Sequence, residues 1–571
     1  MMAQTNSQQG GRKEESRDAR RSVVETVFAY HEQTKHHFHR YARTLGHLDW
    51  ATQPHPFRYY EGSFQAQLVR SRSPRPLIYD RLYEKNPLSP QAVDLDSLAD
   101  LFRYSLAISA WKQAGSSRWA LRINPSSGNL HPTEAYAVLP PLSGASATPA
   151  LYHYVSESHV LERRASFSDD VWRSFTKSLP EGSFLVGLSS IIWREAWKYG
   201  ERAFRYCQHD VGHAVASLRF AAVFSGWTFH LVSSWSTEDI AQLLGLNRTD
   251  DFCEAELEEA ELLAVVTPNT SSELSGPSLL PPDDITMQRI RETTWYGRPN
   301  QLSGSHVCWP VIEEVTIATK MPRAAAPIES SPLDHQRSEN TQSSSGLNAR
   351  QIISQRRSCL ALDGVSEISR ERFIRMLART LPGPHPPWDA LYWTPKIHLL
   401  LFVHRVVGLQ PGVYILVRDQ TKTDVLRSAC DTKLVWQTPA GVPLKFPLYL
   451  LVDADCRKTA RAMSCQQDIA ADGFFSLGML AEFAEPIQQH GPSFYRNLFW
   501  EAGVIGQVLY LEAEAAGARS TGIGCFFDDP VHDVLGLRGN QFQSLYHFTV
   551  GMPIEDNRLQ SWPPYGEREN K

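Results

Sequence analysis

The stretch AFRYCQHDVGHAVASLRFAAVFSGW (residues 203–227) has a counterpart 291 residues further along the chain, FYRNLFWEAGVIGQVLYLEAEAAGA (residues 494–518). Four residues recur at this one offset, in the pairs Arg205 and Arg496, Gly212 and Gly503, Gly226 and Gly517, and Gly245 and Gly536. Solenoid repeats have periods of up to roughly 50 residues, so this period is far too long for a solenoid. It indicates two domains of common ancestry that pack together as a pseudo-dimer.

The composition permits two complete hydrophobic cores. The chain has 571 residues, of which 42% are hydrophobic, and a domain takes ~100–200 residues. The net charge of −5 argues against a nucleic-acid-binding protein, which needs a basic face. The apolar stretches are shorter than the about 20 residues that span a bilayer. The N-terminal segment MMAQTNSQQGGRKEESRDARR has no apolar run typical of a secretory signal.

The cysteines suggest neither a zinc site nor a disulfide framework. No C-x-x-C pair occurs among them, and their spacing is irregular. The eight are Cys207, Cys253, Cys308, Cys359, Cys430, Cys456, Cys465 and Cys525. We expect free thiols in a cytoplasmic protein.

Composition shifts divide the chain into four parts. Residues 1–22 are predicted to be a disordered tail, residues 23–270 the first domain and residues 348–565 the second. Residues 271–347 form a connector with one aromatic-rich patch, WYGRPNQLSGSHVCWP, followed by a segment rich in Ser, Pro and charge. Such a segment buries too little apolar surface to become ordered.

Periodicity predicts an α+β sandwich in each half. Helices are expected over residues 23–45, 95–113, 205–224, 473–484 and 492–517. Strands are expected over residues 135–139, 151–155, 262–266 and 446–454, with a hairpin over 398–417. The Pro-rich residues 51–90 are expected to be extended.

The sharpest local signal is the sequence RINPSSGNLHP, residues 122–132. Small hydroxyls, a glycine and an amide between prolines make a rigid polar loop. Such a loop offers backbone N–H and side-chain amide groups to a flat heteroaromatic ligand. The candidate binding residues here are Arg122, Pro125, Ser126, Ser127 and Asn129. The alternative is an ordinary turn.

A second signal is WREAWKYGERAFRY, residues 193–206. The adjacent Lys198 and Tyr199 are candidates for a general acid or base if burial moves a pKa toward neutrality. The alternative is structural, with the arginines of this segment paired with Glu195 and Glu201.

The second half offers a candidate phosphate site. Arg356, Arg357 and Ser358 combine guanidinium forks with a hydroxyl, which suits a phosphate monoester. The sequence TGIGCF (residues 521–526), with Gly522 and Gly524, is a glycine loop that lets backbone approach a ligand closely. Arg558 adds another cation near the end of the chain.

Two histidine groups are given structural roles. His31, His36, His37 and His39 crowd one predicted helix without an acidic or cysteine partner in the pattern, so no metal site is predicted. Capping or packing accounts for His209-Asp210 and His213 on the helix over 205–224.

These motifs together resemble the FMN-dependent nitroreductase superfamily. RINPSSGNLHP resembles its P-S-S-x-N-x-Q-P loop, with His131 where Gln is usual. WKYGERAFRYCQHDVGHA resembles the SagB/ThcOx-type dehydrogenase branch, whose members oxidise azolines in peptide natural products. RRSC, GIGCF and Arg558 resemble the flavin-phosphate and ring-contact elements. The resemblance covers most of residues 100–270 and 350–560.

The resemblance implies two nitroreductase-like α/β sandwich domains fused as an intramolecular pseudo-dimer, with FMN at the interface. The first half would supply Arg122, Pro125, Ser126, Ser127 and Asn129, and the second Arg356, Ser358, Gly522, Gly524 and Arg558. The second half has only a degenerate PGPHPPW (residues 382–388) in place of the P-S-S-x-N loop, and the first has no R-x-S-x-R. One FMN per chain and a monomeric protein are therefore expected. Leu360 departs from the basic third position of R-x-S-x-R.

The resemblance further implies an FMN-dependent dehydrogenase or oxidase. A hydride would pass from a carbon next to a heteroatom to flavin N5, and then to an acceptor such as O2, with Lys198 and Tyr199 catalytic and His131 the next candidate. The substrate would be a small molecule or a peptide. Two alternatives stay open: an NAD(P)H-dependent reductase of nitro, quinone or enone compounds, and a flavin-binding pseudoenzyme scaffold.

Overall fold

The computed structural model describes residues 22–69, 74–268, 279–324 and 346–565. The predicted disordered tail, apart from residue 22, and nearly all of the Ser/Pro-rich linker lie outside these residues. Within the described ranges, no helix is long and apolar enough to cross a membrane.

The first half is built on an antiparallel sheet. Among the described residues its strands lie in the order β2 (Gln65–Gln67), β7 (Val160–Ser166), β6 (Ala150–Val155), β5 (Thr133–Leu139), β8 (Phe184–Ser190), β10 (Glu259–Pro268) and β9 (Trp227–Leu231). β5, β6 and β8 are buried along their whole length, because the sheet is covered on both faces.

The second half has a similar antiparallel sheet. Its described strands lie in the order β16 (Leu448–Asp453), β15 (Gly412–Leu416), β13 (Ile397–Val403), β17 (Phe475–Glu482), β19 (Phe542–Gly551) and β18 (Arg519–Ile523). Two short pairs join β1 (Tyr60–Glu61) to β11 (Arg298–Pro299) and β12 (Ile368–Ser369) to β14 (Val406–Val407). The predicted α+β fold class is confirmed.

Helices cover both sheets. Those of the first half and the connector are α2 (Leu95–Arg103), α3 (Asp169–Thr176), α4 (Ile192–Tyr199), α5 (Ala203–Phe224), α6 (Thr237–Leu244), α7 (Thr249–Phe252), α8 (Asp284–Glu292) and α9 (Pro310–Ala318). Those of the second half are α10 (Ala349–Gln355), α11 (Arg370–Thr380), α12 (Thr423–Ala429), α13 (Arg457–Met463), α14 (Ile469–Asp472), α15 (Ala484–His490), α16 (Phe494–Ala515) and α17 (Asp528–Leu535). A further helix over residues 22–33 precedes them.

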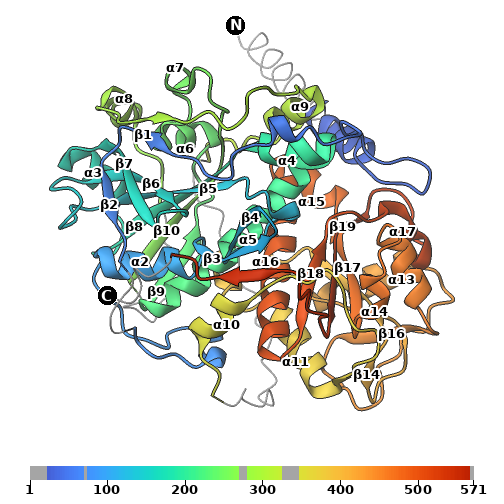
Figure 1. The fold of residues 1–571 in the computed structure, drawn as a ribbon. Coiled ribbons are helices and arrows are strands. Elements are labelled where there is room, and N and C mark those ends of the chain that lie inside the picture. The colour runs from blue at the N-terminus through green and yellow to red at the C-terminus, as the bar shows by residue number, and fades with distance from the viewer. Residues whose placement is uncertain (1–21, 70–73, 269–278, 325–345, 566–571) are drawn as a thin grey trace, which may run out of the picture.

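The two long helices α5 and α16 cross between the sheets (Figure 1). A Cβ atom built on Gly212 would lie 2.2 Å from the carbonyl oxygen of Trp500, and one on Gly503 would lie 2.3 Å from that of His209. The backbones therefore touch at this crossing, and only glycine fits on either side. This pair of repeated glycines marks a contact between the two halves, and a hydrophobic core runs through it.

The repeated arginines also connect the halves. Nη1 of Arg205 on α5 lies 2.7 Å from a carboxylate oxygen of Asp528 in the second half. Nη1 of Arg496 on α16 lies 2.6 Å from a carboxylate oxygen of Glu261 in the first half. All four side chains are buried. A buried charge is tolerated when it is paired, so each half supplies the counter-ion that the other needs.

The ends of the described chain cross between the halves. In the helix over residues 22–33, the His31 ring is 3.1 Å from the hydroxyl of Tyr495 and packs on Phe483 in the second half. In the opposite direction, β20 (Gln560–Trp562) pairs with β3 (Ile108–Ala114), which also pairs with β4 (Ser117–Arg122). The expected domains 23–270 and 348–565 are thus interlocked in space.

Three predicted helices are corrected. The helix expected over 95–113 ends at Arg103, and its second part forms β3, which turns through Gly115 into β4. Residues 475–482, expected to be helical, form the central strand β17, because a continuous apolar run fits a buried strand and a buried helix equally well. The N-terminal helix stops at residue 33 rather than 45. The long helices expected over 205–224 and 492–517 are confirmed as α5 and α16.

Candidate active site

The polar loop of residues 122–132 connects β4 to β5 and is held rigid by its own side chains. The backbone N–H of His131 donates to Oγ of Ser126 at 2.8 Å, and Nδ2 of Asn129 donates to the carbonyl of Ala120 at 2.9 Å. Asn129 and His131 both have φ near +55°, at 60° and 51°. Non-glycine residues rarely adopt this conformation, and they cluster at functional sites when they do.

Lys198 and Tyr199 lie against this loop. They form the end of α4, which Gly200 terminates. A Cβ atom built on Gly128 would be 2.6 Å from the hydroxyl oxygen of Tyr199 and 3.2 Å from Nζ of Lys198. The structure thus brings the two predicted catalytic residues to the predicted binding loop. Burial raises the pKa of Tyr199, so this phenol is held as a proton donor.

Two buried carboxyl groups lie beneath the same loop. Oδ1 of Asp210, on α5, accepts the backbone N–H of Ser127 at 3.2 Å, and its other oxygen has no hydrogen bond within the described chain. Glu195, one turn before Tyr199 on α4, has both oxygens buried without a hydrogen-bond partner among the described residues. Burial raises the pKa of Asp210 to about 7. Burial, followed by the charge of Asp210, raises that of Glu195.

These contacts change two interpretations of the sequence. The structural alternative paired Glu195 with an arginine, but Arg194 pairs with Glu134 instead. Glu201 does have an arginine near it, Arg43, at 3.5 Å. Asp210 was given a capping or packing role, whereas it lies at the loop. The periodicity of α5 conceals this position, because every residue of that helix is buried.

The second half reaches the same loop through Arg356. Its guanidinium donates to the carbonyl oxygens of Arg122 at 2.9 Å and Ile123 at 3.0 Å. The hydroxyl of Ser358 and the backbone N–H of Gly522 both lie within hydrogen-bond distance of the Tyr510 hydroxyl, at 2.8 and 3.0 Å. The two halves therefore meet here, as the resemblance implies.

The glycine loop makes room for two tyrosines. A Cβ atom on Gly522 would lie 2.0 Å from the Tyr546 hydroxyl, and one on Gly524 would lie 2.4 Å from the Tyr206 ring. The Tyr206 ring in turn packs on Tyr199, with ring centroids 4.6 Å apart. Aromatic rings thus connect the glycine loop of one half to the candidate catalytic pair of the other.

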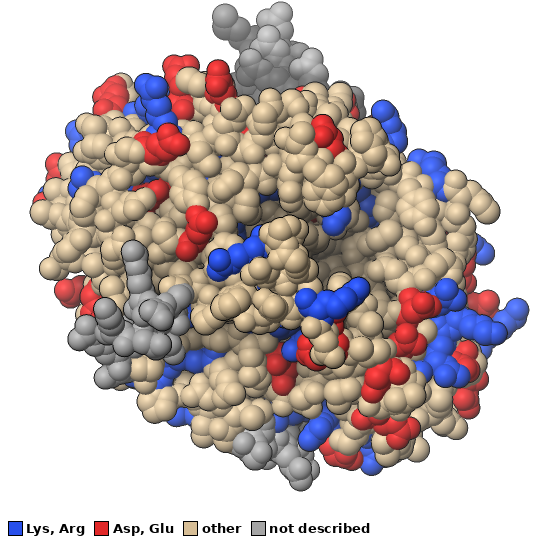
Figure 2. All heavy atoms as spheres, in the orientation of Figure 1, with Lys and Arg blue, Asp and Glu red and all other residues tan. Residues whose placement is uncertain are grey.

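A basic cluster lies next to this junction. It consists of Lys112, Arg356, Arg357 and Arg519. Burial, and then the neighbouring Arg356, lower the pKa of Arg357 to about 10. Burial, and then Arg357 and Arg519, lower the pKa of Lys112. In the view of Figure 2, Lys and Arg side chains lie around a hollow near the middle of the face.

Two predicted residues lie away from the expected position. Arg558 is in a turn of its own, pairs with Asp556 at 2.7 Å and has a side chain 87% exposed. Arg122 is buried and directs its guanidinium to the carbonyl of Pro56 at 2.8 Å, so only its backbone meets Arg356. Leu360 is 87% exposed, and Lys112 and Arg519 provide positive charge near Arg357 instead.

The histidine-rich N-terminal segment does bring His37 near carboxylates. Glu32, His37 and Asp529 have ligand atoms close enough to hold a cation. Nζ of Lys35, however, lies 2.8 Å from Glu32 and 2.9 Å from Asp529. The Lys35 ammonium group therefore already forms ion pairs with both carboxylates.

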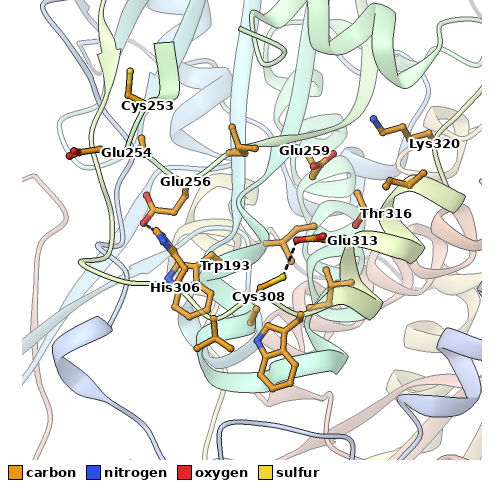
Figure 3. A pocket seen from close by; sticks show the side chains of 18 residues that line it. Trp193, Cys253, Glu254, Glu256, Glu259, His306, Cys308, Glu313, Thr316 and Lys320 are labelled. Atoms are coloured by element: carbon orange, nitrogen blue, oxygen red, sulfur yellow. Dashed lines mark hydrogen bonds and ion pairs between the residues drawn. The ribbon is translucent and has the colours of Figure 1, made fainter. Parts of the chain in front are cut away.

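A separate cavity of about 700 Å³ lies on another side of α4 (Figure 3). Its walls come from α4, α9 and residues 253–259 and 306–308. Glu256, which accepts from Nε2 of His306 at 2.7 Å, is on one side, and Thr316 and Lys320 are on the other. Part of the aromatic-rich patch of the connector lines this cavity, so the connector contributes to the folded structure.

Comparisons agree with this architecture. Residues 353–552 match the Nitroreductase family model. A putative nitroreductase from Anabaena variabilis superposes with a TM-score of 0.65 at 21% identity, covering 93% of this chain and 99% of that one. The fold of that protein therefore extends over both halves, and the family model matches the second half.

Other solved structures match about a third of the chain. The Escherichia coli microcin synthetase McbBCD complex with truncated pro-MccB17 has a TM-score of 0.26 at 18% identity, covering 35% of this chain and 71% of that one. A putative NAD(P)H:FMN oxidoreductase from Staphylococcus epidermidis has a TM-score of 0.21 at 12% identity, covering 36% and 87%. Among curated proteins, none matches this chain significantly.

Proposed function

We propose that this protein is an FMN-dependent oxidoreductase of the SagB/ThcOx type. One observation carries the proposal: the loop of residues 122–132 meets Lys198 and Tyr199 on one side and Arg356 of the other half on the other. The nitroreductase-family match over residues 353–552 supports a flavin as the cofactor.

The donor groups at the junction fit a flavin phosphate. The basic cluster gathers four cations. Arg519 pairs with Glu555 at 2.7 Å, and the carboxyl group of Glu514 lies near Arg356, Arg357 and Arg519. Buried guanidinium groups that lie close together favour the binding of an anion, and a phosphate accepts several charge-assisted hydrogen bonds. Nε of Arg122, Oδ1 of Asn124 and Nδ1 of His131 are buried without hydrogen bonds among the described residues. Buried polar atoms of this kind call for a polar ligand or water.

The chain's own residues would position the substrate and move its proton. FMN, when bound, accepts a hydride from a carbon next to a heteroatom and passes the electrons on, for which we propose O2. Lys198 and Tyr199 would take up or supply the substrate proton, since both face the loop. Asp210, with a pKa raised to about 7, can hold a proton near them at neutral pH.

We further propose that the protein works as a monomer on a small molecule or a peptide. The interface that other members of the superfamily form between subunits would here lie between the halves, around α5 and α16. Light scattering tests this, and an obligate dimer would count against it.

Flavin analysis of the purified protein tests the proposed function. We expect one FMN per chain, released by heat and quantified against protein. Arg356→Ala should weaken FMN binding roughly 10–100-fold, the effect of losing a hydrogen bond to a charged group worth about 1.5–3 kcal/mol. Arg558→Ala is the matched control and should change nothing, because this side chain is exposed and paired with Asp556.

Three results would oppose the proposal. A colourless protein that binds no added FMN would exclude a flavoenzyme. A ratio near two would mean that the second half-site also binds flavin. Turnover that requires NADPH and a nitro, quinone or enone acceptor would favour a reductase instead.

A further inference from the structure

Two thiols from distant parts of the second half meet beside the candidate active site. Sγ of Cys525 lies 2.8 Å from Sγ of Cys465, and both side chains are half-buried. Cys525 directly follows Gly524, whose carbonyl oxygen accepts the Tyr206 hydroxyl at 3.1 Å. The thiol pair is therefore connected through Tyr206 to Tyr199, on which the Tyr206 ring packs.

The backbone is bent to bring these thiols together. Cys465 and Gln466, in the turn after α13, have φ of 52° and 61°. Two consecutive non-glycine residues in this region are strained, and such strain persists only where surrounding contacts hold it. Gln467 provides these contacts, because its Nε2 donates to the carbonyl of Ser464 at 2.9 Å and to that of Cys525 at 3.0 Å.

The surroundings favour a thiolate at Cys525. Nδ1 of His36 accepts the N–H of Ala42 at 2.9 Å, so the proton of the neutral ring is on Nε2, and the ring hydrogen-bonds the Cys525 side chain. The hydrogen bond from Cys465, and after it His36 and the charge of Arg202, lower the pKa of Cys525 to about 5. The same shared proton raises the pKa of Cys465. A thiolate with a neighbouring thiol is the arrangement of reactive cysteines.

We propose that Cys465 and Cys525 form a redox-active dithiol that hydrogen peroxide converts into a disulfide on the glycine loop. Cys525 would attack peroxide, so that an S–O bond forms, the O–O bond breaks and one water leaves. Cys465 would then attack the sulfenic sulfur, so that the S–S bond forms, the S–O bond breaks and a second water leaves. Two thiols are oxidised, one peroxide is reduced to two waters, and a dithiol reductant reverses the change.

The disulfide would join the glycine loop to the turn after α13. If the protein passes electrons to O2, as proposed above, peroxide would form next to these thiols. Only this source of peroxide rests on the proposed function. Added peroxide tests the dithiol without flavin or substrate.

The test is peroxide titration of the reduced protein, followed by alkylation and peptide mass analysis. Of the eight cysteines, we expect two to lose reactivity and one cross-linked peptide pair to contain Cys465 and Cys525. Dithiothreitol should restore both thiols. In Cys465→Ser the cross-link should vanish, and dimedone should trap a sulfenic acid at Cys525. Cys253→Ser and Cys308→Ser are controls that should still form the cross-link, since both thiols are exposed elsewhere.

Two outcomes would overturn the dithiol: eight thiols that survive stoichiometric peroxide, or cross-links that join other cysteines. The proposed function can fail separately. A protein without flavin that still forms the Cys465–Cys525 cross-link would refute the flavoenzyme and support the dithiol. A yellow, active protein without the cross-link would support the flavoenzyme and refute the dithiol.

Discussion

Asp210 on α5 and Glu501 on α16 occupy equivalent positions of the repeat, yet their carboxyl groups have opposite environments. Asp210 accepts the backbone N–H of Ser127 and lies under the candidate active-site loop. Glu501 forms a buried ion pair with Arg418 and accepts the N–H groups of Lys396 at 2.9 Å and Ile397 at 3.2 Å. One carboxyl group is left available for proton transfer, and the other is neutralised by its neighbours.

The surroundings of Glu501 explain why the second half-site differs. Arg418 also lies over the Trp388 ring, 4.7 Å from its centroid, and Trp388 ends the degenerate PGPHPPW segment. Nε1 of Trp388 donates to the carbonyl of Arg379 at 3.0 Å. Aromatic and ionic side chains thus fill this position in the second half. Both halves keep a carboxyl group at this position, and only that of the second half is held in a buried ion pair.

The comparison extends to the candidate catalytic pair and predicts the largest effect. The residues equivalent to Lys198 and Tyr199 are Gln489 and His490, both exposed. Lys198→Ala or Tyr199→Phe should lower kcat ~10²–10⁴-fold, which is about 3–5 kcal/mol of activation barrier. The flavin absorbance should persist. Gln489→Ala and His490→Ala are matched controls, and their kcat should equal that of the wild type.

Other results would change the assignment. A colourless, poorly folded Lys198→Ala would make the pair structural. A yellow and fully active variant would place proton transfer elsewhere, with His131 the next candidate because it flanks the loop.

The next prediction compares how much the carboxyl groups of Asp210 and Glu501 contribute to the free energy of unfolding. Glu501→Gln leaves Arg418 buried without its counter-ion and should lower the free energy of unfolding by about 3–5 kcal/mol. Asp210→Asn removes a carboxyl group that has no ion pair among the described residues, so at about pH 4, where the wild-type carboxyl group is still protonated in the folded protein, we expect a loss below about 1 kcal/mol. Denaturant titration of both variants measures this difference. Equal losses would mean that the two positions are energetically alike.

The last effect is a pH dependence of stability to which the carboxyl group of Asp210 contributes together with that of Glu195. Burial raises its pKa from 3.8 to about 7, so the folded protein binds a proton that the unfolded chain lacks between these values. This contribution to stability is full below the unfolded pKa and is lost as the pH rises through the folded one. The slope is at most about 1.4 kcal/mol per pH unit.

Unfolding free energies of the wild type and Asp210→Asn, measured from about two pH units below the folded pKa of Asp210 to about two above it, test this directly. As the pH rises, the wild type should lose stability relative to the variant, and this difference in unfolding free energy should level off above about pH 7. Parallel curves would show that Asp210 ionises normally.

Much of the fold follows from sequence pattern alone. The internal repeat predicted two related domains that pack together. The structure adds that α5 and α16 touch at Gly212 and Gly503, because two helix backbones approach this closely only where side chains are absent. Residues 475–482 could not be assigned correctly, since an apolar run carries no period that distinguishes a central strand from a buried helix. The strand β3 within residues 104–113 forms because it pairs with β4, and no local sequence pattern records this contact.

The candidate site likewise contains residues that the sequence indicates and residues that only the structure reveals. Several site residues can be found from the sequence, because they are close together along the chain and their residue types are unusual. These are the loop RINPSSGNLHP, the adjacent Lys198 and Tyr199, and Arg356. Glu195 and Asp210 carry no such signal, since one lies among paired charges and the other in a fully buried helix.

The sequence by itself determined the duplicated architecture, the two long helices and the residues of the polar loop, because these depend on local spacing and on an internal repeat. Tertiary structure alone decided which carboxyl groups remain unpaired, that Arg558 stays in solvent, and that Cys465 meets Cys525. Desolvation and ion pairing depend on every group within a few ångströms. Those groups come from segments far apart in the chain, so no local pattern records them.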